Sequence, residues 1–189
     1  MIKKPLLIIE HCEEELSRWL LLEYKNVVEI WESRVVFTNV KDKKAYLKLN
    51  KFAKVEKKNA KEFLGNKKCI VLDPKSKKAL APKDFINFDA VIIGGILGYK
   101  KPRDRTKKLI SGRYNFKTRN LGKIQLSIDG AAFVAKAISM GIPLKEIEIS
   151  YEVEIVHDKI HSTILPYGYP VIDDKPMITP GIVEYLRKY

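Results

Sequence analysis

A buried strand that runs into a glycine-rich loop constrains this chain most. Residues 88–93 are mostly apolar and β-branched, which is typical of a parallel strand covered on both faces. Gly94, Gly95 and Gly98 follow, and then the alternating charges of residues 103–105. Because glycine has no Cβ, such a loop lets the backbone approach a ligand closely. The pattern predicts a ligand-binding loop beside fixed charges, but a glycine turn leading into a solvated basic helix fits these residues equally well.

Composition indicates a single globular domain with an unusual charge. The 189 residues are 46% hydrophobic and 31% charged, which is enough to bury a core. The formal net charge of +13 favours a polyanionic partner such as RNA or a ribosomal surface, although surface lysine that serves thermal stability explains it equally well. We expect one domain over residues 1–189, with a lysine-rich insertion at about 41–68. Aromatic residues in this segment are read as the core side of amphipathic helices rather than as a base-stacking surface.

Cysteine, histidine and hydropathy patterns narrow the setting. Cys12 and Cys69 form neither a disulfide framework nor a metal-binding spacing, so we expect a reducing cytoplasm. His157 and His161 have no neighbouring ligands at metal spacing, so no metal is expected. The sequence shows neither a signal segment nor a run long enough to cross a membrane.

Apolar segments alternate with amphipathic ones, which predicts an α/β protein with a mainly parallel sheet. In residues 10–15, Glu10 and His11 are read as a charge pair and an exposed histidine, and the following acids as the first turn of a helix. Gly112 is expected to break any helix that begins at Thr106. Strands are expected at residues 5–9, 35–38, 69–72, 88–93 and 146–156, and helices at 16–24, 43–51, 59–64, 131–140 and after 179.

Three loops have the character of a ligand-binding rim: residues 72–74, 94–105 and 120–129. The first two follow strands, and ligands bind at the carboxyl ends of parallel strands. The third precedes an alanine-rich helix for which Ser127 or Asp129 is the expected N-cap, so it offers free backbone N–H groups.

These loops, together with Ile8-Ile9-Glu10-His11 and Leu22-Glu23-Tyr24, carry a resemblance in the correct order over nearly the whole chain. The sequence resembles a small family in the SPOUT superfamily of S-adenosylmethionine-dependent methyltransferases. Its members include a yeast enzyme that methylates an arginine of a ribosomal protein, and archaeal proteins described as RNA methyltransferases. The resemblance implies a sheet flanked by helices whose C-terminal part forms a deep trefoil knot, and a cofactor pocket near a possible homodimer interface.

The resemblance also implies site residues. An arginine acceptor is protonated and needs carboxylates to orient it, whereas an RNA acceptor would need arginine on phosphate. Both substrate classes therefore stay open, as does a cofactor-free RNA- or ribosome-binding module that kept the fold. Tyr99 replaces a family aspartate, and Lys100-Lys101 replaces a histidine–proline pair. The implied catalytic residues are Glu10, Arg103, Asp104, Arg105 and Asp129, and the implied S-adenosylmethionine ligands are Leu72, Asp73, Pro74, Gly94, Gly95, Ile96, Leu97, Gly98, Leu121, Gly122, Ile124, Gln125, Leu126 and Ser127.

Overall fold

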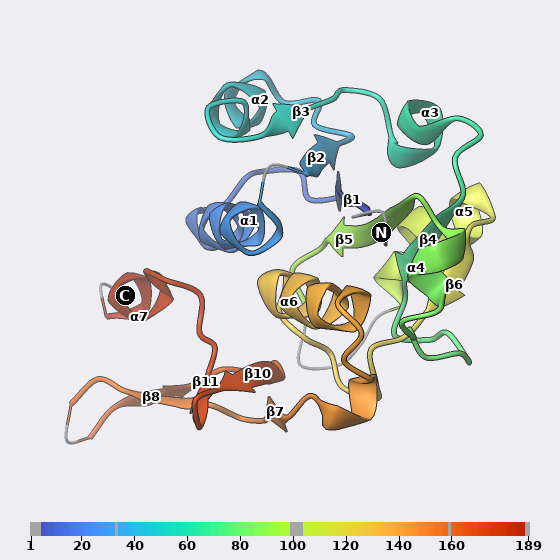
Figure 1. The fold of residues 1–189 in the computed structure, drawn as a ribbon. Helices are drawn as coiled ribbons and strands as arrows, with labels where there is room; N and C mark the ends of the chain where they lie inside the picture. The colour runs from blue at the N-terminus through green and yellow to red at the C-terminus, as the bar shows by residue number, and fades with distance from the viewer. Residues whose placement is uncertain (1–4, 33, 99–103, 159, 188–189) are drawn as a thin grey trace.

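A six-stranded parallel sheet forms the centre of the protein (Figure 1). The computed structural model describes residues 5–32, 34–98, 104–158 and 160–187. The strand order is β3-β2-β1-β5-β4-β6, and every ladder in this sheet is parallel. The strands are β1 (Leu6–His11), β2 (Val35–Thr38), β3 (Lys54–Val55), β4 (Cys69–Leu72), β5 (Ala90–Gly95) and β6 (Lys117–Arg119).

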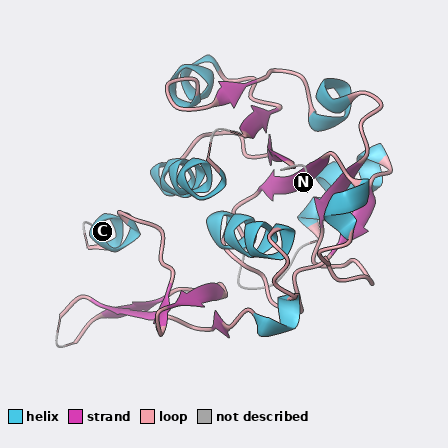
Figure 2. Cartoon of the chain, viewed as in Figure 1, coloured by secondary structure: helices cyan, strands magenta, loops and turns pink. Residues whose placement is uncertain are grey.

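Helices cover both faces of this sheet (Figure 2). Leu7 and Ile9 of β1 pack with the long helices α1 and α6 in one core, and Ile8 packs with α3 and the π-helical turn η1 in a second core. The alternation follows from the two-residue period of a strand. The predicted α/β class with a mainly parallel sheet is confirmed. The helical elements are α1 (Arg18–Trp31), α2 (Lys43–Leu49), α3 (Ala60–Leu64), α4 (Asp84–Asn87), η1 (Lys107–Ser111), α5 (Gly112–Tyr114), α6 (Ile128–Ser139) and α7 (Ile182–Leu186).

The C-terminal third adds small antiparallel elements to the parallel sheet. A three-stranded sheet has the order β11-β10-β7, and β8 pairs with β9. Trp19 of α1 packs on the third core, whose buried members Leu165, Tyr167 and Tyr169 come from this region. The C-terminal segment is thereby fastened to α1. The elements are η2 (Leu144–Glu146), β7 (Ile149–Ser150), β8 (Glu154–Val156), β9 (Ser162–Ile164), β10 (Tyr169–Ile172) and β11 (Lys175–Pro176).

Several local predictions hold. Strands β2 and β4 have the predicted bounds. Helix α3 begins after the cap Asn59, which forms a capping box with Glu62. Ser127, one of the two expected caps, accepts a hydrogen bond from the backbone N–H of Gly130 at 3.1 Å and begins α6. The lysine-rich segment at 41–68 forms α2, β3 and α3, and β3 supplies one edge of the main sheet.

Other local predictions are wrong. Residues 146–156 form no continuous strand, because Glu152 adopts a left-handed conformation (φ 51°) between β7 and β8. Gly112 does not break the helix after Thr106, since η1 runs directly into α5. Helix α1 begins after the cap Ser17, so the acids at 13–15 precede it. The last helix begins at Ile182 rather than next to Thr179.

Candidate active site

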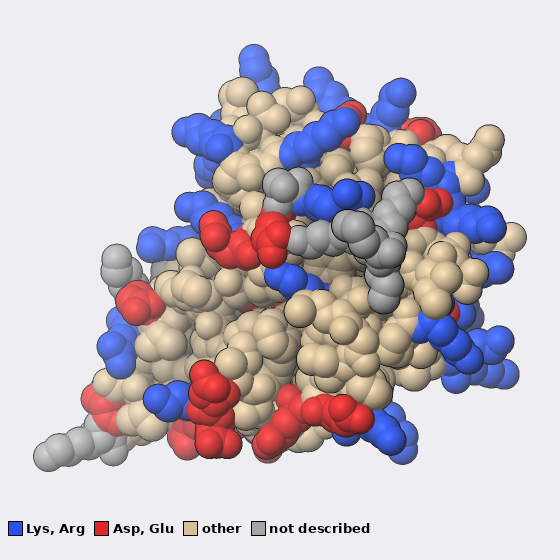
Figure 3. Space-filling model, in the orientation of Figure 1, with Lys and Arg blue, Asp and Glu red and all other residues tan. Residues whose placement is uncertain are grey.

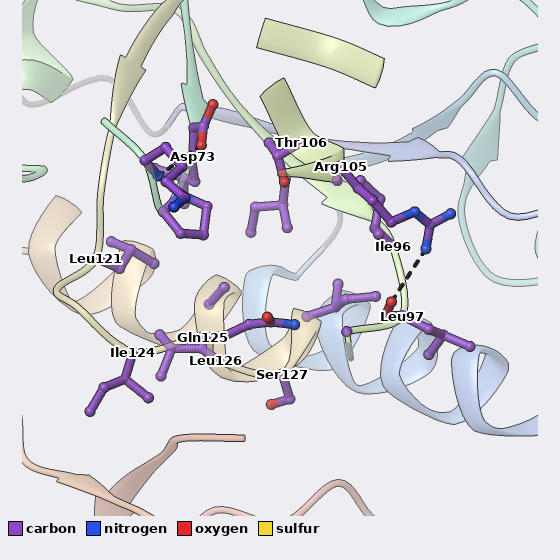
Figure 4. A pocket seen from close by; sticks show the side chains of 18 of the residues that line it. Asp73, Ile96, Leu97, Arg105, Thr106, Leu121, Ile124, Gln125, Leu126 and Ser127 are labelled. Atoms are coloured by element: carbon purple, nitrogen blue, oxygen red, sulfur yellow. Dashed lines mark hydrogen bonds between the residues drawn. The ribbon is translucent and has the colours of Figure 1, made fainter. Parts of the chain in front are cut away.

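A cavity lies at the carboxyl edge of the main sheet, where the three predicted loops meet. Strands β4 and β5 are adjacent and parallel, so the loops that follow them leave the same edge. The loop that enters α6 closes the other side (Figure 4). Sequence reasoning did not single out Lys75, Ile93, Thr106, Ile128 and Ala131, which also line the cavity. The predicted cofactor ligands that line it are Leu72, Asp73, Pro74, Gly94, Ile96, Leu97, Gly98, Leu121, Gly122, Ile124, Gln125, Leu126 and Ser127.

Glu13 holds the glycine loop in place. Its carboxylate accepts a hydrogen bond from the Leu97 backbone N–H at 2.8 Å. It also accepts two from the Arg105 guanidinium, at 2.8 and 3.2 Å. Arg105 in turn donates to the Leu97 carbonyl oxygen at 3.4 Å (Figure 4). Sequence reasoning missed Glu13, and the available signal was a row of acids directly after a strand whose carboxyl end faces the cavity.

Asp73 and Lys75 form the wall that follows β4. Asp73 is buried and accepts hydrogen bonds from the Ser111 hydroxyl at 2.6 Å and the Lys75 backbone N–H at 2.9 Å. These bonds fix the turn that leaves the strand. The Lys75 ammonium lies 3.4 Å from a carboxylate oxygen of Asp104, whose backbone is left-handed (φ 53°). Asp104 therefore stands at the exposed mouth of the cavity with one cation beside it.

The loop before α6 is held by the C-terminal segment. The Gly168 backbone N–H donates to the Gln125 carbonyl at 2.9 Å, and the Tyr167 hydroxyl donates to the Gly98 carbonyl at 2.9 Å. A Cβ at Gly98 would lie 1.7 Å from the Gln125 amide nitrogen, so the glycine is required by this close approach. Among the hydrogen bonds of the described residues, none uses the backbone N–H of Leu121 or Ile124. These two donors are free to meet a ligand.

Gly95 does not line the cavity, although it was expected to bind the cofactor. It belongs to β5, where it pairs with His11 of β1. A Cβ added there would lie 1.9 Å from the hydroxyl oxygen of Tyr24, which is fully buried. Glycine is needed at this position for packing between the sheet and α1. His11, expected to be exposed, is buried, and its Nδ1 lies 3.0 Å from the same Tyr24 hydroxyl.

The predicted catalytic residues separate into two groups. Asp104 and Arg105 line the cavity, whereas Glu10 and Asp129 do not. Glu10 is buried and accepts hydrogen bonds from the Thr38 hydroxyl at 2.5 Å and the Ala60 backbone N–H at 2.8 Å. It thus ties the strand edge to α3, and burial raises the pKa of its carboxyl group. Arg103 lies outside the described residues, as do Tyr99, Lys100 and Lys101.

Asp129 lies beneath the cavity in a buried polar cluster. Its carboxylate accepts hydrogen bonds from the Thr179 hydroxyl at 2.6 Å and the Asn26 amide at 2.8 Å. The nearby Glu23 accepts from the Ile128 backbone N–H at 3.1 Å and from Trp19 at 2.7 Å. Burial, and then repulsion from Asp129, raise the pKa of Glu23 to about 8. The cluster ties α1, α6 and the C-terminal segment together under the floor of the cavity.

Comparison with known proteins agrees with this geometry. The family model described as "Protein arginine N-methyltransferase SFM1-like" matches residues 6–189. Protein arginine N-methyltransferase SFM1 of Saccharomyces cerevisiae is 30% identical over 200 residues, which cover 96% of this chain and 93% of the yeast protein. The crystal structure of yeast SFM1 complexed with SAM superposes with a TM-score of 0.89 at 28% identity, over 97% of this chain and 90% of that one. A dual-specific Trm10 from Thermococcus kodakaraensis shares the fold (TM-score 0.58, 19% identity, 75% of this chain and 96% of that one).

The fold and the cavity at its carboxyl edge therefore define a SPOUT-type α/β methyltransferase. The chain belongs to the SFM1-like family of protein arginine N-methyltransferases. This membership confirms the expected enzyme class, a methyltransferase that uses S-adenosylmethionine. Within the described ranges, no helix is both long and apolar enough to cross a bilayer, and no three His, Cys, Asp or Glu side chains are grouped to hold a metal ion.

Proposed function

We propose that this protein transfers a methyl group from S-adenosylmethionine to an arginine side chain of a protein. The observation that carries the proposal is the cavity in which three separate loops meet at the carboxyl edge of the sheet. The family and the yeast relative named above support the protein-arginine acceptor. RNA, the other substrate class open from the sequence, has no comparable support, and the fitted cavity argues against a binding module without a cofactor.

The residues that line the cavity fit an adenosyl group. Apolar side chains such as Leu72, Ile96 and Leu126 offer faces for a flat base. The free backbone N–H groups of Leu121 and Ile124 can donate to ring nitrogens, and the close approach at Gly98 keeps the glycine loop near the loop that precedes α6. When bound, S-adenosylmethionine supplies an electrophilic methyl group on a sulfonium.

Asp104 is the carboxylate best placed for the acceptor. A guanidinium is protonated at neutral pH and attacks only after it is oriented and loses a proton. The exposed side chain of Asp104 faces the cavity mouth, where it can accept that proton as the nitrogen–carbon bond forms. A second hollow shares Leu97 and Arg105 with the cavity and is lined by Glu13, Glu14 and Glu15. We assign this acidic hollow to the positive acceptor arginine.

The test is transfer of radiolabel from S-adenosylmethionine into an extract of cells that lack the enzyme. We expect label in protein that survives ribonuclease and yields methylarginine after hydrolysis. Asp104→Asn should lower the rate by ~10²-fold, the usual effect of losing a general base, and leave cofactor affinity in calorimetry unchanged. Asp173→Asn, in an exposed acid of the turn between β10 and β11, is the matched control and should retain full activity. Label that is released by ribonuclease would contradict the protein acceptor.

We also propose that the C-terminal part of the chain is knotted and that the enzyme works in the reducing cytoplasm. In support of the knot, η1 and α5 cover one face of the sheet and α6 covers the other, with edge strand β6 between them in sequence. A chain pulled from both ends should then stop short of the full extension of about 3.3–3.6 Å per residue. Full extension would exclude the knot. Cys12 and Cys69 are free thiols, which fits the proposed compartment.

A further inference from the structure

A basic groove lies at the amino ends of β4, β5 and β6, the edge of the sheet opposite the cofactor cavity. It is lined by residues that precede or begin these strands, among them Lys67, Lys68, Phe88 and Lys117. Lys61 of α3 and Lys83, which caps α4, complete the rim. None of the residues that line the cofactor cavity belongs to this groove. Its composition therefore needs an explanation other than methyl transfer.

Positive charge in this groove is not neutralised by the protein itself. Among the described residues, Lys61, Lys67, Lys68, Lys83 and Lys117 form no ion pair. The one acid that lines the groove, Asp84, is already held by the Arg119 guanidinium at 2.7 and 3.0 Å. Five exposed ammonium groups thus surround a hollow without a counter-charge, which is the arrangement expected for an anionic ligand.

Two aromatic rings lie between these cations. The Lys117 ammonium stands 5.8 Å from the ring centroid of Phe88, and the Lys61 ammonium 5.6 Å from that of Phe116. Both rings line the groove and are half-buried. A basic groove with aromatic faces can hold phosphates and stack bases together.

The positive surface continues from the groove along edge strand β6. Lys117 and Arg119 also line a neighbouring hollow with Lys75, Lys77 and Lys78, and Lys75 lines the cofactor cavity as well. The basic residues therefore form a continuous track from the amino edge of the sheet to the mouth of the active site. Figure 3 shows lysine and arginine gathered over the side of this face where Figure 1 places β4, β6 and α4, and acidic residues along the border near β7 and β8.

We propose that this basic track, comprising the groove lysines 61, 67, 68, 83 and 117 together with Lys77 and Lys78, binds the phosphate backbone of single-stranded RNA. A row of cations along one edge matches a linear polyanion, and the two rings match unpaired bases. RNA is here a bound partner that positions the enzyme on its target, not the methyl acceptor. The proposal stands independently of the arginine chemistry.

The experiment is fluorescence anisotropy with a labelled, mixed-sequence RNA longer than the ~4–16 nucleotides that one single-strand-binding domain covers. The test variant carries Lys67→Gln, Lys68→Gln, Lys83→Gln and Lys117→Gln. The control carries Lys43→Gln, Lys44→Gln, Lys48→Gln and Lys51→Gln, which removes the same charge from exposed lysines in and just after α2, at the other end of the sheet. All eight side chains are exposed, so circular dichroism should show both variants folded.

We expect the wild type to bind RNA with a steep salt dependence. With a slope of about −0.7 per phosphate on single strands, each lost contact costs about fivefold in affinity at ~0.1 M salt. The groove variant should therefore bind at least about tenfold more weakly, and its salt slope should fall by about 3. The α2 control should stay close to the wild type. Equal losses in both variants, no RNA binding by the wild type, or displacement of the RNA by an equimolar acidic polypeptide would each overturn the proposal.

Discussion

Glu13→Gln tests whether the glycine loop is preorganised for the cofactor. Glu13 accepts hydrogen bonds from Arg105 and Leu97, and the two charged side chains are 19% and 25% exposed. A hydrogen bond to a charged group contributes about 1.5–3 kcal/mol. Partial exposure reduces this value, and glutamine keeps one acceptor, so we expect a cost of about 1–2 kcal/mol.

The loss should appear in binding because the loop forms one wall of the cavity. If the ordered loop becomes a minority conformation, apparent affinity falls in proportion to its population. A cost of 1–2 kcal/mol corresponds to a factor of about 5–30 in affinity. Titration of S-adenosylhomocysteine by calorimetry measures this factor directly.

Glu14→Gln is the matched control, since it removes the same charge from an exposed neighbour. No hydrogen bond or ion pair in the described structure involves the Glu14 side chain, so its affinity should equal that of the wild type. An unchanged affinity for Glu13→Gln, or equal losses in both variants, would refute the argument that Glu13 acts by holding the loop.

Two further predictions concern the core. Gly95→Ala should lower the free energy of unfolding by about 1–3 kcal/mol, because its Cβ would meet the Tyr24 hydroxyl at 1.9 Å; adding Tyr24→Phe should recover part of the loss in urea unfolding, and no recovery would show that the hydroxyl is not the obstacle. Burial raises the pKa of Glu23 from 4.5 to about 8, so the folded state binds more protons than the unfolded state between these values. The free energy of unfolding should therefore fall as pH rises from about 4.5 to about 8, and Glu23→Gln should flatten this fall; an identical pH profile for the variant would count against the assignment.

Local structure was accessible from the sequence where short-range chemistry determines it. The unbroken apolar runs of β2 and β4 announced strands buried on both faces, and both have the predicted bounds. Asn59 and Ser127 announced the starts of α3 and α6, because a side-chain oxygen there satisfies backbone N–H groups of the first turn. The three loops were recognised for the same reason: glycine, proline and polar residues at strand ends leave few local conformations.

Tertiary contacts decided which loop residues face the cavity. Gly94, Gly95 and Gly98 look alike in sequence, yet Gly95 faces Tyr24 while Gly98 faces Gln125. Glu10 and Asp129 looked like catalytic acids, but partners 50 residues away in the chain hold them in buried positions. The alternating pattern of residues 146–156 predicted one strand, whereas the bend at Glu152 divides it into β7, which pairs with β10, and β8, which pairs with β9.

The sequence by itself thus determined the fold class, the family and the three loops that form the cavity. Only the tertiary structure showed that Glu13 reaches Leu97, 84 residues away, and that lysines from α3, α4 and β6 line one groove. The physical reason is that hydrophobic period and capping act between neighbours in the chain, whereas side-chain contacts depend on the order of strands in the sheet. That order places the ends of β4, β5 and β6 side by side, with the cofactor cavity at one edge and the basic groove at the other.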